Sequence, residues 1–208
     1  MVDGTKNASI NQIKILRTQA RAAGNPVLRD GTFDFLVNLA EKKRPRKILE
    51  VGVNVGLTGA ALLLVCPDSA LTGIEISESL SAAAKENYKR FGVDSRAKIF
   101  TGDASAIIPV LTGKYDLIFI DGPKGHYYEY LPYLKDALNV GGVLFADDVA
   151  FHGYIKGDAP RKHSTIKRSI ENYLSAVTRD KDFLTRVYDT EDGFCVSEKL
   201  DGSNRGNI

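Results

Sequence analysis

The chain has 208 residues, of which 43% are hydrophobic and 26% are charged, an ordinary composition for a globular protein. This length is sufficient for one domain with a hydrophobic core. The longest apolar stretch, residues 60–66, is too short to span a bilayer, and the N-terminus lacks the apolar segment of a secretory signal. We therefore expect a cytoplasmic protein with no membrane partner.

The formal net charge of +2 is too small to indicate nucleic-acid binding by itself. Basic residues gather over residues 42–47 and again over residues 156–168, and the first cluster is expected to be a solvated surface. The chain contains two cysteines, Cys66 and Cys195, each in an apolar context. This pattern predicts buried free thiols in a reducing compartment and no disulfide framework.

Helical and strand patterns alternate along the chain. The expected helices cover residues 8–22, 30 onward, 58–66, 78–91, 104–111, 127–139 and 164–177. The expected strands cover residues 47–51, 71–75, 97–101, 115–120, 142–146, 183–189 and 193–198. Asp30 is expected to cap the second helix, and Gly92 is expected to end the helix over residues 78–91.

This alternation predicts an α/β fold with a Rossmann-like, doubly wound parallel sheet and helices on both faces. The turn signal at residues 190–193 separates the last two strands, so the sheet is expected to finish in an antiparallel hairpin. We predict a single domain over residues 1–208. It comprises N-terminal helices over residues 1–45, the core over 46–199 and a disordered tail over 200–208.

Two apolar runs of the predicted sheet stop at carboxylates. The run at residues 115–120 is followed by Asp121, and the run at residues 142–146 is followed by Asp147 and Asp148. Ligands of an open parallel sheet bind beyond the carboxyl ends of its strands, so these acids are expected at one edge. Three converging carboxylates repel one another unless a cation lies between them, and oxygen ligands suit Mg²⁺. The alternative is that Asp147 and Asp148 only cap a turn.

Glycines mark the turn after the first strand. Gly52 permits a tight turn, and Gly56 is expected to let a ligand approach the backbone N–H groups of a helix N-terminus. The spacing differs from the G-x-G-x-x-G of dinucleotide sites. Glu75 ends the next strand, where its carboxylate can accept hydrogen bonds from both hydroxyls of a ribose. The alternative is that Glu75 caps the helix that follows.

Four motifs resemble those of class I S-adenosylmethionine-dependent O-methyltransferases. They are ILEVG at residues 48–52, GDA at 102–104, DGPKGHY at 121–127 and ADDV at 146–149. More narrowly, they are similar to the metal-dependent catechol and caffeoyl-CoA group, especially its bacterial branch, which includes enzymes that methylate 5-hydroxyuridine in tRNA. The resemblance covers roughly residues 8–199. It implies a seven-stranded sheet, mostly parallel with an antiparallel C-terminal strand, which agrees with the predicted hairpin.

The resemblance also implies a set of site residues. S-adenosylmethionine would be bound by Leu28, Glu50, Gly52, Asn54, Thr58, Glu75, Asp103, Ala104 and Asp121. A divalent cation, Mg²⁺ or Mn²⁺, would be held by Asp121, Asp147 and Asp148. The family normally has asparagine at the third of these positions, so Asp148 adds a negative charge to the site.

Lys124 and Asp121 are the predicted catalytic residues. A divalent ion lowers the pKa of a bound hydroxyl, and Lys124 can accept or electrostatically stabilise the proton loss. Because a dication disfavours the charged form of a neighbouring lysine, the pKa of Lys124 is expected to fall. His126 and His152 flank the site in the sequence and stay outside the catalytic set.

The sequence therefore predicts an S-adenosylmethionine- and metal-dependent O-methyltransferase. Its acceptor would be a hydroxyl of an RNA nucleoside, of the 5-hydroxyuridine type in tRNA, or of a small hydroxylated aromatic. Residues 149–163 mix aromatic, glycine and basic residues, which favours a mobile loop over the pocket. Family resemblance and the apolar face of the first helix imply a homodimer.

Two other classes stay open. An NAD-dependent oxidoreductase is disfavoured by the missing G-x-G-x-x-G motif and by the terminal hairpin. A non-catalytic cofactor- or RNA-binding module is disfavoured because Asp121, Lys124 and Asp147 are all present.

Overall fold

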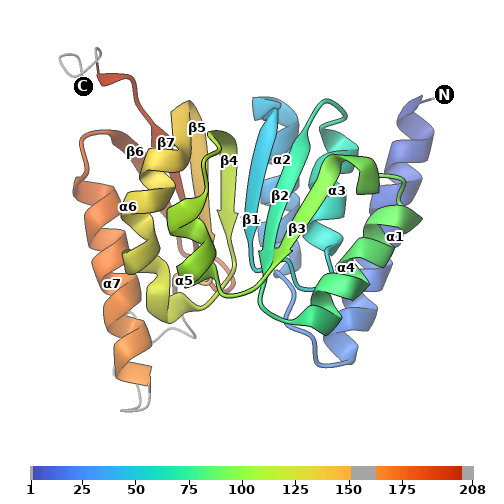
Figure 1. Cartoon of the computed structure of the whole chain (residues 1–208), viewed down its shortest axis with the longest axis horizontal. Coiled ribbons are helices and arrows are strands. Elements are labelled where there is room, and N and C mark those ends of the chain that lie inside the picture. The colour runs from blue at the N-terminus through green and yellow to red at the C-terminus, as the bar shows by residue number, and fades with distance from the viewer. Residues whose placement is uncertain (1, 151–162, 203–208) are drawn as a thin grey trace. The chain divides into compact units, whose positions relative to one another are not determined.

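The computed structural model describes residues 2–150 and 163–202. The chain divides into two compact units, residues 1–104 and 105–208 (Figure 1). The organisation as one domain stays a prediction. None of the helices in the described ranges is long and apolar enough to cross a membrane.

The N-terminal unit contains three parallel strands in the order β3-β2-β1. Helix α3 contacts β2, α1, α2 and α4, and α4 also contacts β2 and β3. The elements are α1 (Val2–Ala22), α2 (Asp30–Lys43), β1 (Lys47–Val51), α3 (Leu57–Val65), β2 (Ala70–Glu75), α4 (Glu78–Arg90), the 3₁₀ turn η1 (Asp94–Arg96) and β3 (Ala97–Thr101).

The C-terminal unit contains four strands in the order β4-β5-β7-β6. Strands β4 and β5 are parallel, and β7 runs antiparallel to both β5 and β6. Helices α5, α6 and α7 lie in front of these strands in Figure 1, and α6 contacts both β5 and α7. The elements are α5 (Ala104–Ile107), η2 (Ile108–Val110), β4 (Tyr115–Ile120), η3 (Lys124–His126), α6 (Tyr127–Ala137), β5 (Leu138–Asp147), α7 (Ser164–Arg179), β6 (Phe183–Tyr188) and β7 (Phe194–Lys199).

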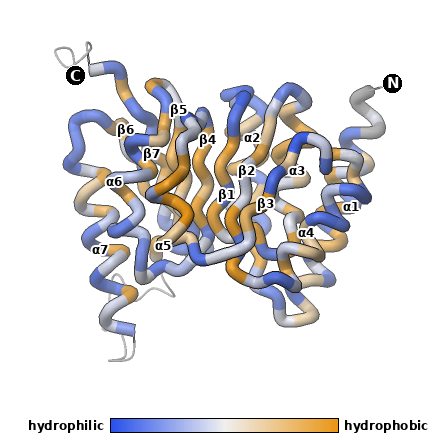
Figure 2. Tube along the Cα trace, viewed as in Figure 1, coloured by the Kyte–Doolittle hydropathy of each residue, from blue (hydrophilic) through white to orange (hydrophobic). Residues whose placement is uncertain are grey.

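Hydrophobic residues are concentrated along the strands of each unit (Figure 2). In β1 every residue from Ile48 to Val51 is buried, and in β4 the run from Leu117 to Ile120 is buried. A strand buried on both faces is apolar nearly throughout, which is why these runs could be recognised in the sequence. Cys66 and Cys195 are buried free thiols, as predicted.

Most predicted elements are confirmed, and the predicted bounds of β1, β3 and β4 agree with the structure. The terminal hairpin is confirmed by β6 and β7, and Gly193 in its turn has a φ of 71°. Gly92 also has a positive φ, 65°, and follows Phe91, the residue that caps the C-terminus of α4.

Several predicted boundaries are wrong. The helix predicted over residues 104–111 ends at Ile107, where η2 follows, and the helix predicted over 127–139 ends at Ala137. The first helix begins at Val2, and an ion pair of 2.7 Å between Lys6 and Glu41 links its polar first turns to α2. Asp30 is the first residue of α2 and makes no N-terminal cap; Arg29 occupies the cap position. Strand β5 begins at Leu138 because a register shift in its pairing with β4 accommodates the glycine-containing residues 139–142.

Candidate functional site

The turns after β1 and β3 both meet the end of β2. The backbone N–H of Gly52 donates to the carbonyl of Ile74 at 2.9 Å, and that of Gly102 donates to the carbonyl of Glu75 at 2.8 Å. Gly52 has a φ of 91°, which confirms that the first turn requires glycine. The predicted cofactor residues Gly52, Glu75 and Asp103 therefore belong to segments that lie next to one another at one edge of this unit.

Glu75 holds a buried carboxylate at this edge, with 6% of the residue exposed. Its Oε2 accepts from the backbone N–H of Asn54 at 2.7 Å, and its Oε1 accepts from the backbone N–H of Ser77 at 3.0 Å. The residue that caps α4 is Ser77, whose side chain accepts from Leu80, so the alternative role of Glu75 as a helix cap is wrong. A carboxylate has about four lone-pair positions, so acceptor capacity remains for a diol.

Asn54 connects this carboxylate to the segment between α1 and α2. Its φ is 53°, a left-handed conformation that asparagine adopts more readily than most residues. The Nδ2 of Asn54 donates to the carbonyl of Pro26 at 2.6 Å, and its Oδ1 accepts from the backbone N–H of Val55 at 2.7 Å. Leu28, the predicted apolar cofactor contact, is 2% exposed in the same segment.

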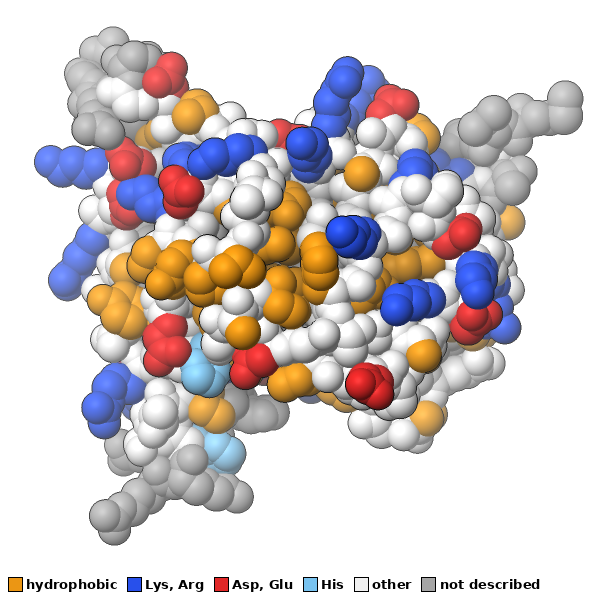
Figure 3. All heavy atoms as spheres, in the orientation of Figure 1, with side chains coloured by type: hydrophobic (Ala, Val, Ile, Leu, Met, Phe, Trp, Pro, Cys, Tyr) orange, Lys and Arg blue, Asp and Glu red, His pale blue; other side chains and the backbone are white. Residues whose placement is uncertain are grey.

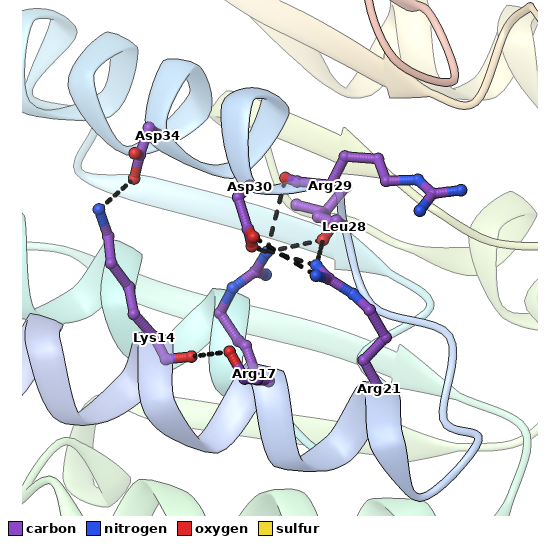
Figure 4. Close-up of polar contacts among 8 residues, drawn as sticks. Lys14, Arg17, Arg21, Leu28, Arg29, Asp30 and Asp34 are labelled. Atoms are coloured by element: carbon purple, nitrogen blue, oxygen red, sulfur yellow. Dashed lines mark hydrogen bonds and ion pairs between the residues drawn. The ribbon is translucent and has the colours of Figure 1, made fainter.

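Two arginines on α1, Arg17 and Arg21, bind the segment between α1 and α2 (Figure 4). Arg17 and Arg21 both donate to the carbonyl of Leu28, at 2.6 and 3.0 Å, and both contact Oδ1 of Asp30 at 3.1 Å. The hydrogen bond from Arg21 is the main cause that lowers the pKa of Asp30. Neither arginine belongs to a recognised motif, and the one local signal is the position of Arg17 four residues after Ile13, on the apolar face of α1.

Two other predicted cofactor contacts lie in tightly packed surroundings. Gly56 has a φ of 75°, and a Cβ atom there would lie 2.8 Å from the Cβ of Ala84, so its close neighbour is α4. Gly56 is therefore required by helix packing, and its predicted role in ligand approach stays a prediction. Glu50 is 1% exposed, with its Oε2 3.4 Å from the hydroxyl of Tyr88. Of the remaining predicted contacts, Thr58 is half-buried, Asp103 is exposed and Ala104 is buried.

The predicted metal ligands follow β4 and β5 of the C-terminal unit. Ile120 pairs with Ala146 in the parallel register, which places Asp121 and Asp147 directly after paired positions. The buried hydroxyl of Tyr127 lies 3.2 Å from the carbonyl oxygens of both Ile120 and Asp147. This tyrosine therefore ties the two strand ends together.

Lys124 lies among these acids. Its Nζ is 3.3 Å from Oδ1 of Asp121 and 3.4 Å from Oδ2 of Asp148. Burial disfavours its ammonium, but Asp121, Asp148 and Asp147 outweigh that effect and raise the pKa of Lys124. Among these carboxylates alone, the negative charges stabilise the protonated amine, and the predicted fall of this pKa beside a divalent cation stays a prediction.

The pKa of Asp147 is strongly perturbed. Burial, followed by the negative charge of Asp121, raises the pKa of Asp147 to about 8. A carboxylate that is buried beside another carboxylate keeps its proton, because both burial and repulsion disfavour the charged form. A cation at this site would relieve the repulsion.

The donor set fits a hard cation in its chemistry. All three predicted ligands supply oxygen, and Asp148 has a φ of 53°, which suits both aspartate and the family's asparagine. Within residues 2–150 and 163–202, no group of three or more His, Cys, Asp or Glu side chains has a geometry that could hold a metal ion. The cation site with Asp121, Asp147 and Asp148 as ligands therefore stays a prediction.

Of the two flanking histidines, His126 lies in the described residues and pairs with α6, the helix that follows it. His126 contacts Glu129 at 2.7 Å and stacks on Tyr130, with ring centroids 5.8 Å apart. His152 lies outside the described residues, as do residues 151–162 of the predicted loop and residues 203–208 of the predicted tail.

Comparison with known proteins identifies the family. Residues 10–200 match the model of the O-methyltransferase family. The chain belongs to this family. An O-methyltransferase from Aspergillus hancockii is 32% identical over 121 residues, which cover 55% of this chain and 47% of that protein. A catechol O-methyltransferase from Niastella koreensis is 32% identical over 126 residues, which cover 58% of this chain and 57% of that protein.

Solved structures of O-methyltransferases confirm the predicted fold class. One from Streptomyces achromogenes, in complex with SAM, has a TM-score of 0.82 and 21% identity and covers 93% of this chain and 90% of its own. One from Bacillus cereus, in complex with SAH, has a TM-score of 0.79 and 20% identity, with coverage of 92% and 91%. The chain spans about half the length of the curated relatives that it matches.

The raised pKa of Asp147 predicts how stability depends on pH in the presence of EDTA. The folded protein holds this proton up to about pH 8, whereas an unfolded aspartate releases it near pH ~4. Because the folded state binds more protons in this window, the free energy of unfolding falls as the pH rises through it. Urea unfolding between pH 5 and 8.5 measures this slope.

Asp147→Asn removes the titrating group and should flatten the slope. Asp136→Asn is the matched control, because the side chain of Asp136 is 88% exposed on the same unit, and it should keep the wild-type slope. Equal slopes for all three proteins would show that Asp147 is ionised in the folded state.

Proposed function

We propose that this protein is an S-adenosylmethionine-dependent O-methyltransferase that uses a divalent cation, Mg²⁺ or Mn²⁺. The observation that carries the proposal is the carboxylate of Glu75, which two backbone N–H groups hold at the end of β2. An acid in this position can bind the ribose of an adenosyl group. Membership of the O-methyltransferase family over residues 10–200 supports the same assignment.

The reaction that this protein would catalyse is a direct displacement. The acceptor oxygen attacks the methyl carbon of the sulfonium, the carbon–sulfur bond breaks, and S-adenosylhomocysteine leaves while the hydroxyl proton passes to the amine of Lys124 or to solvent. A divalent cation at Asp121, Asp147 and Asp148 would supply Lewis acidity toward the acceptor hydroxyl. Lys124, whose Nζ lies 3.3 Å from Asp121 and 3.4 Å from Asp148, would accept the hydroxyl proton or stabilise the developing oxyanion electrostatically.

The proposed acceptor is a small hydroxylated aromatic. The names of two relatives, a catechol and a caffeoyl-CoA O-methyltransferase, support this class. The hydroxyl of a 5-hydroxyuridine in tRNA is the second acceptor. It is favoured by the sequence of residues 149–163, which interleaves aromatic and basic residues, because RNA recognition uses stacking on aromatic side chains together with phosphate contacts.

Removing the carboxylate of Glu75 tests the cofactor assignment. Glu75→Ala should weaken the binding of S-adenosylhomocysteine by about 2 kcal/mol or more, which is about 30-fold, since charge-assisted contacts have this magnitude. Isothermal titration calorimetry measures the affinity. Glu78→Ala is the matched control, because this exposed acid lies three residues further along the chain. Equal affinities for both variants would contradict the role of Glu75.

Chelation tests the cation. Exhaustive EDTA treatment should abolish methyl transfer from labelled S-adenosylmethionine, and Mg²⁺ or Mn²⁺ should restore it. Asp121→Ala should lose activity, whereas Asp148→Asn, which introduces the family's usual residue, should retain it. The same assay, run with a catechol and with tRNA that contains 5-hydroxyuridine, separates the two acceptors. Full turnover after chelation would show that these carboxylates act without a metal.

We also propose a homodimer that forms along β6. This strand lies at the end of the strand order of its unit, and it leaves Leu184 and Val187 44% and 48% exposed. The two side chains are three positions apart and so lie on opposite faces of the strand, and among the described residues β6 pairs only with β7. An edge strand with exposed apolar side chains on both faces favours association with another chain. Figure 3 shows hydrophobic side chains gathered over α5 and α6. Val110, in η2 and outside β6, is 72% exposed.

Introducing positive charges on β6 should therefore dissociate the proposed homodimer into monomers. The double variant Leu184→Lys, Val187→Lys should be a monomer by light scattering at micromolar concentration, because two lysines on the edge repel their counterparts. Val110→Lys is the control, and its molar mass by light scattering should equal that of the wild-type dimer. A wild-type protein that is monomeric and fully active would contradict the dimer.

A further inference from the structure

We propose that Arg17 is a positioning residue of the cofactor site: it anchors the segment between α1 and α2, and this segment in turn holds Asn54 beside Glu75. The inference rests on the proposed function, since it concerns the binding of S-adenosylmethionine. Nothing in the family's motifs includes Arg17, which lies in the first helix, far from Glu75 in the sequence.

Arg17 is an unusual residue to find inside a helix interface. It is 1% exposed, whereas its acidic partner Asp30 has a side chain that is 69% exposed. Its Nε atom is buried and has no hydrogen-bond partner within the described residues. Removing a guanidinium from water is costly, and apolar replacements of buried ion pairs are often as stable or more stable. Helix packing alone therefore gives no reason for a cation here.

The contacts of Arg17 show what the cation does. Its Nη2 donates to the carbonyl of Leu28 at 2.6 Å and contacts Asp30 at 3.1 Å, while its guanidinium lies 3.9 Å above the ring of Phe33. Arg21 donates to the same carbonyl. Figure 4 shows both arginines reaching from α1 toward Leu28 and Asp30. The planar fork of an arginine can hold a carbonyl and a carboxylate together, so it fixes the direction of the backbone at Leu28.

A short chain of hydrogen bonds continues from this anchor to the carboxylate. Two residues before Leu28, the carbonyl of Pro26 accepts from Nδ2 of Asn54 at 2.6 Å. The backbone N–H of Asn54 then donates to Oε2 of Glu75 at 2.7 Å. Asn54 adopts a left-handed φ of 53°, which is unfavourable for most side chains, so its conformation depends on such partners. If the segment moves, Glu75 loses one of its two backbone donors.

The test compares substitutions on one helix. Arg17→Lys keeps the charge and removes the fork, and Arg17→Met removes both. Lys14→Met is the control, because Lys14 pairs at 2.7 Å with Asp34, and its side chain is 46% exposed. We expect Arg17→Met to weaken the binding of S-adenosylhomocysteine at least 10-fold and Arg17→Lys to weaken it less, while Lys14→Met stays within twofold of the wild type.

Kinetics separate positioning from a general loss of structure. Arg17→Lys should raise the KM for S-adenosylmethionine and leave kcat at saturating S-adenosylmethionine unchanged, because the residue touches neither acceptor nor reacting atoms. Thermal unfolding of each variant without cofactor shows how much stability is lost. If Arg17→Met does not fold, Arg17→Lys decides the question. An Arg17→Lys protein with the affinity and KM of Lys14→Met would overturn the proposal.

A double-mutant cycle tests whether the effect passes through Asn54. Asn54→Ala should weaken the binding of S-adenosylhomocysteine, and adding Arg17→Lys should weaken it no further, since the end of the chain of contacts is already lost. Additive losses would overturn the route through Asn54.

Hydrogen exchange provides a measurement that needs no cofactor. In the protein without cofactor, the backbone N–H of Asn54 should exchange faster in Arg17→Lys than in Lys14→Met, because its hydrogen bond to Glu75 opens more often. Equal exchange rates would overturn the proposal. A wild-type protein that binds neither S-adenosylmethionine nor S-adenosylhomocysteine would instead overturn the proposed function, while the exchange rates would still decide whether Arg17 holds Asn54.

Discussion

A buried carboxylate at the end of a strand must have partners, and this constraint shapes the candidate site of each unit. In the N-terminal unit, Glu75 satisfies it with two backbone N–H groups, which come from the turn after β1 and from the start of α4. In the C-terminal unit, the acids after β4 and β5 satisfy it in part with Lys124. The raised pKa of Asp147 shows that repulsion and burial there are not fully compensated.

Backbone donors at Glu75 and a lysine at the acids of the C-terminal unit suit different ligands. Backbone donors are neutral and fixed by the turns that carry them, so Glu75 keeps acceptor capacity in one direction, which is what a diol requires. A lysine ammonium is mobile on its side chain and can exchange partners, so the acids of the C-terminal unit can receive another cation. The hydroxyl of Tyr127, 3.2 Å from the carbonyls of Ile120 and Asp147, keeps those strand ends together.

Buried polar groups recur in the layer around the Glu75 site. Arg17, Glu50 and Tyr88 are each 1% exposed, yet each has a polar contact, and Gly56 and Gly59 allow α4 to approach closely enough for the contact between Tyr88 and Glu50. Such groups contribute little net stability, because their desolvation offsets their hydrogen bonds. They do restrict local geometry, because Arg17 holds the segment between α1 and α2 at Leu28 and the contact of Glu50 with Tyr88 joins β1 to α4. A site that must hold a cofactor in one orientation has a use for this restriction.

The sequence by itself determined the α/β class, the bounds of β1, β3 and β4, the terminal hairpin, and the positions of Glu75, Asp121, Asp147 and Asp148 at strand ends. These features are local, because an apolar run that stops at a charge or at a turn residue can be recognised within a few positions. The tertiary structure alone decided the register shift that starts β5 at Leu138, the packing role of Gly56, the raised pKa of Lys124 and the contacts of Arg17. Each of these depends on side chains that are distant along the chain or on burial, and neither quantity is present in a local pattern of residue types.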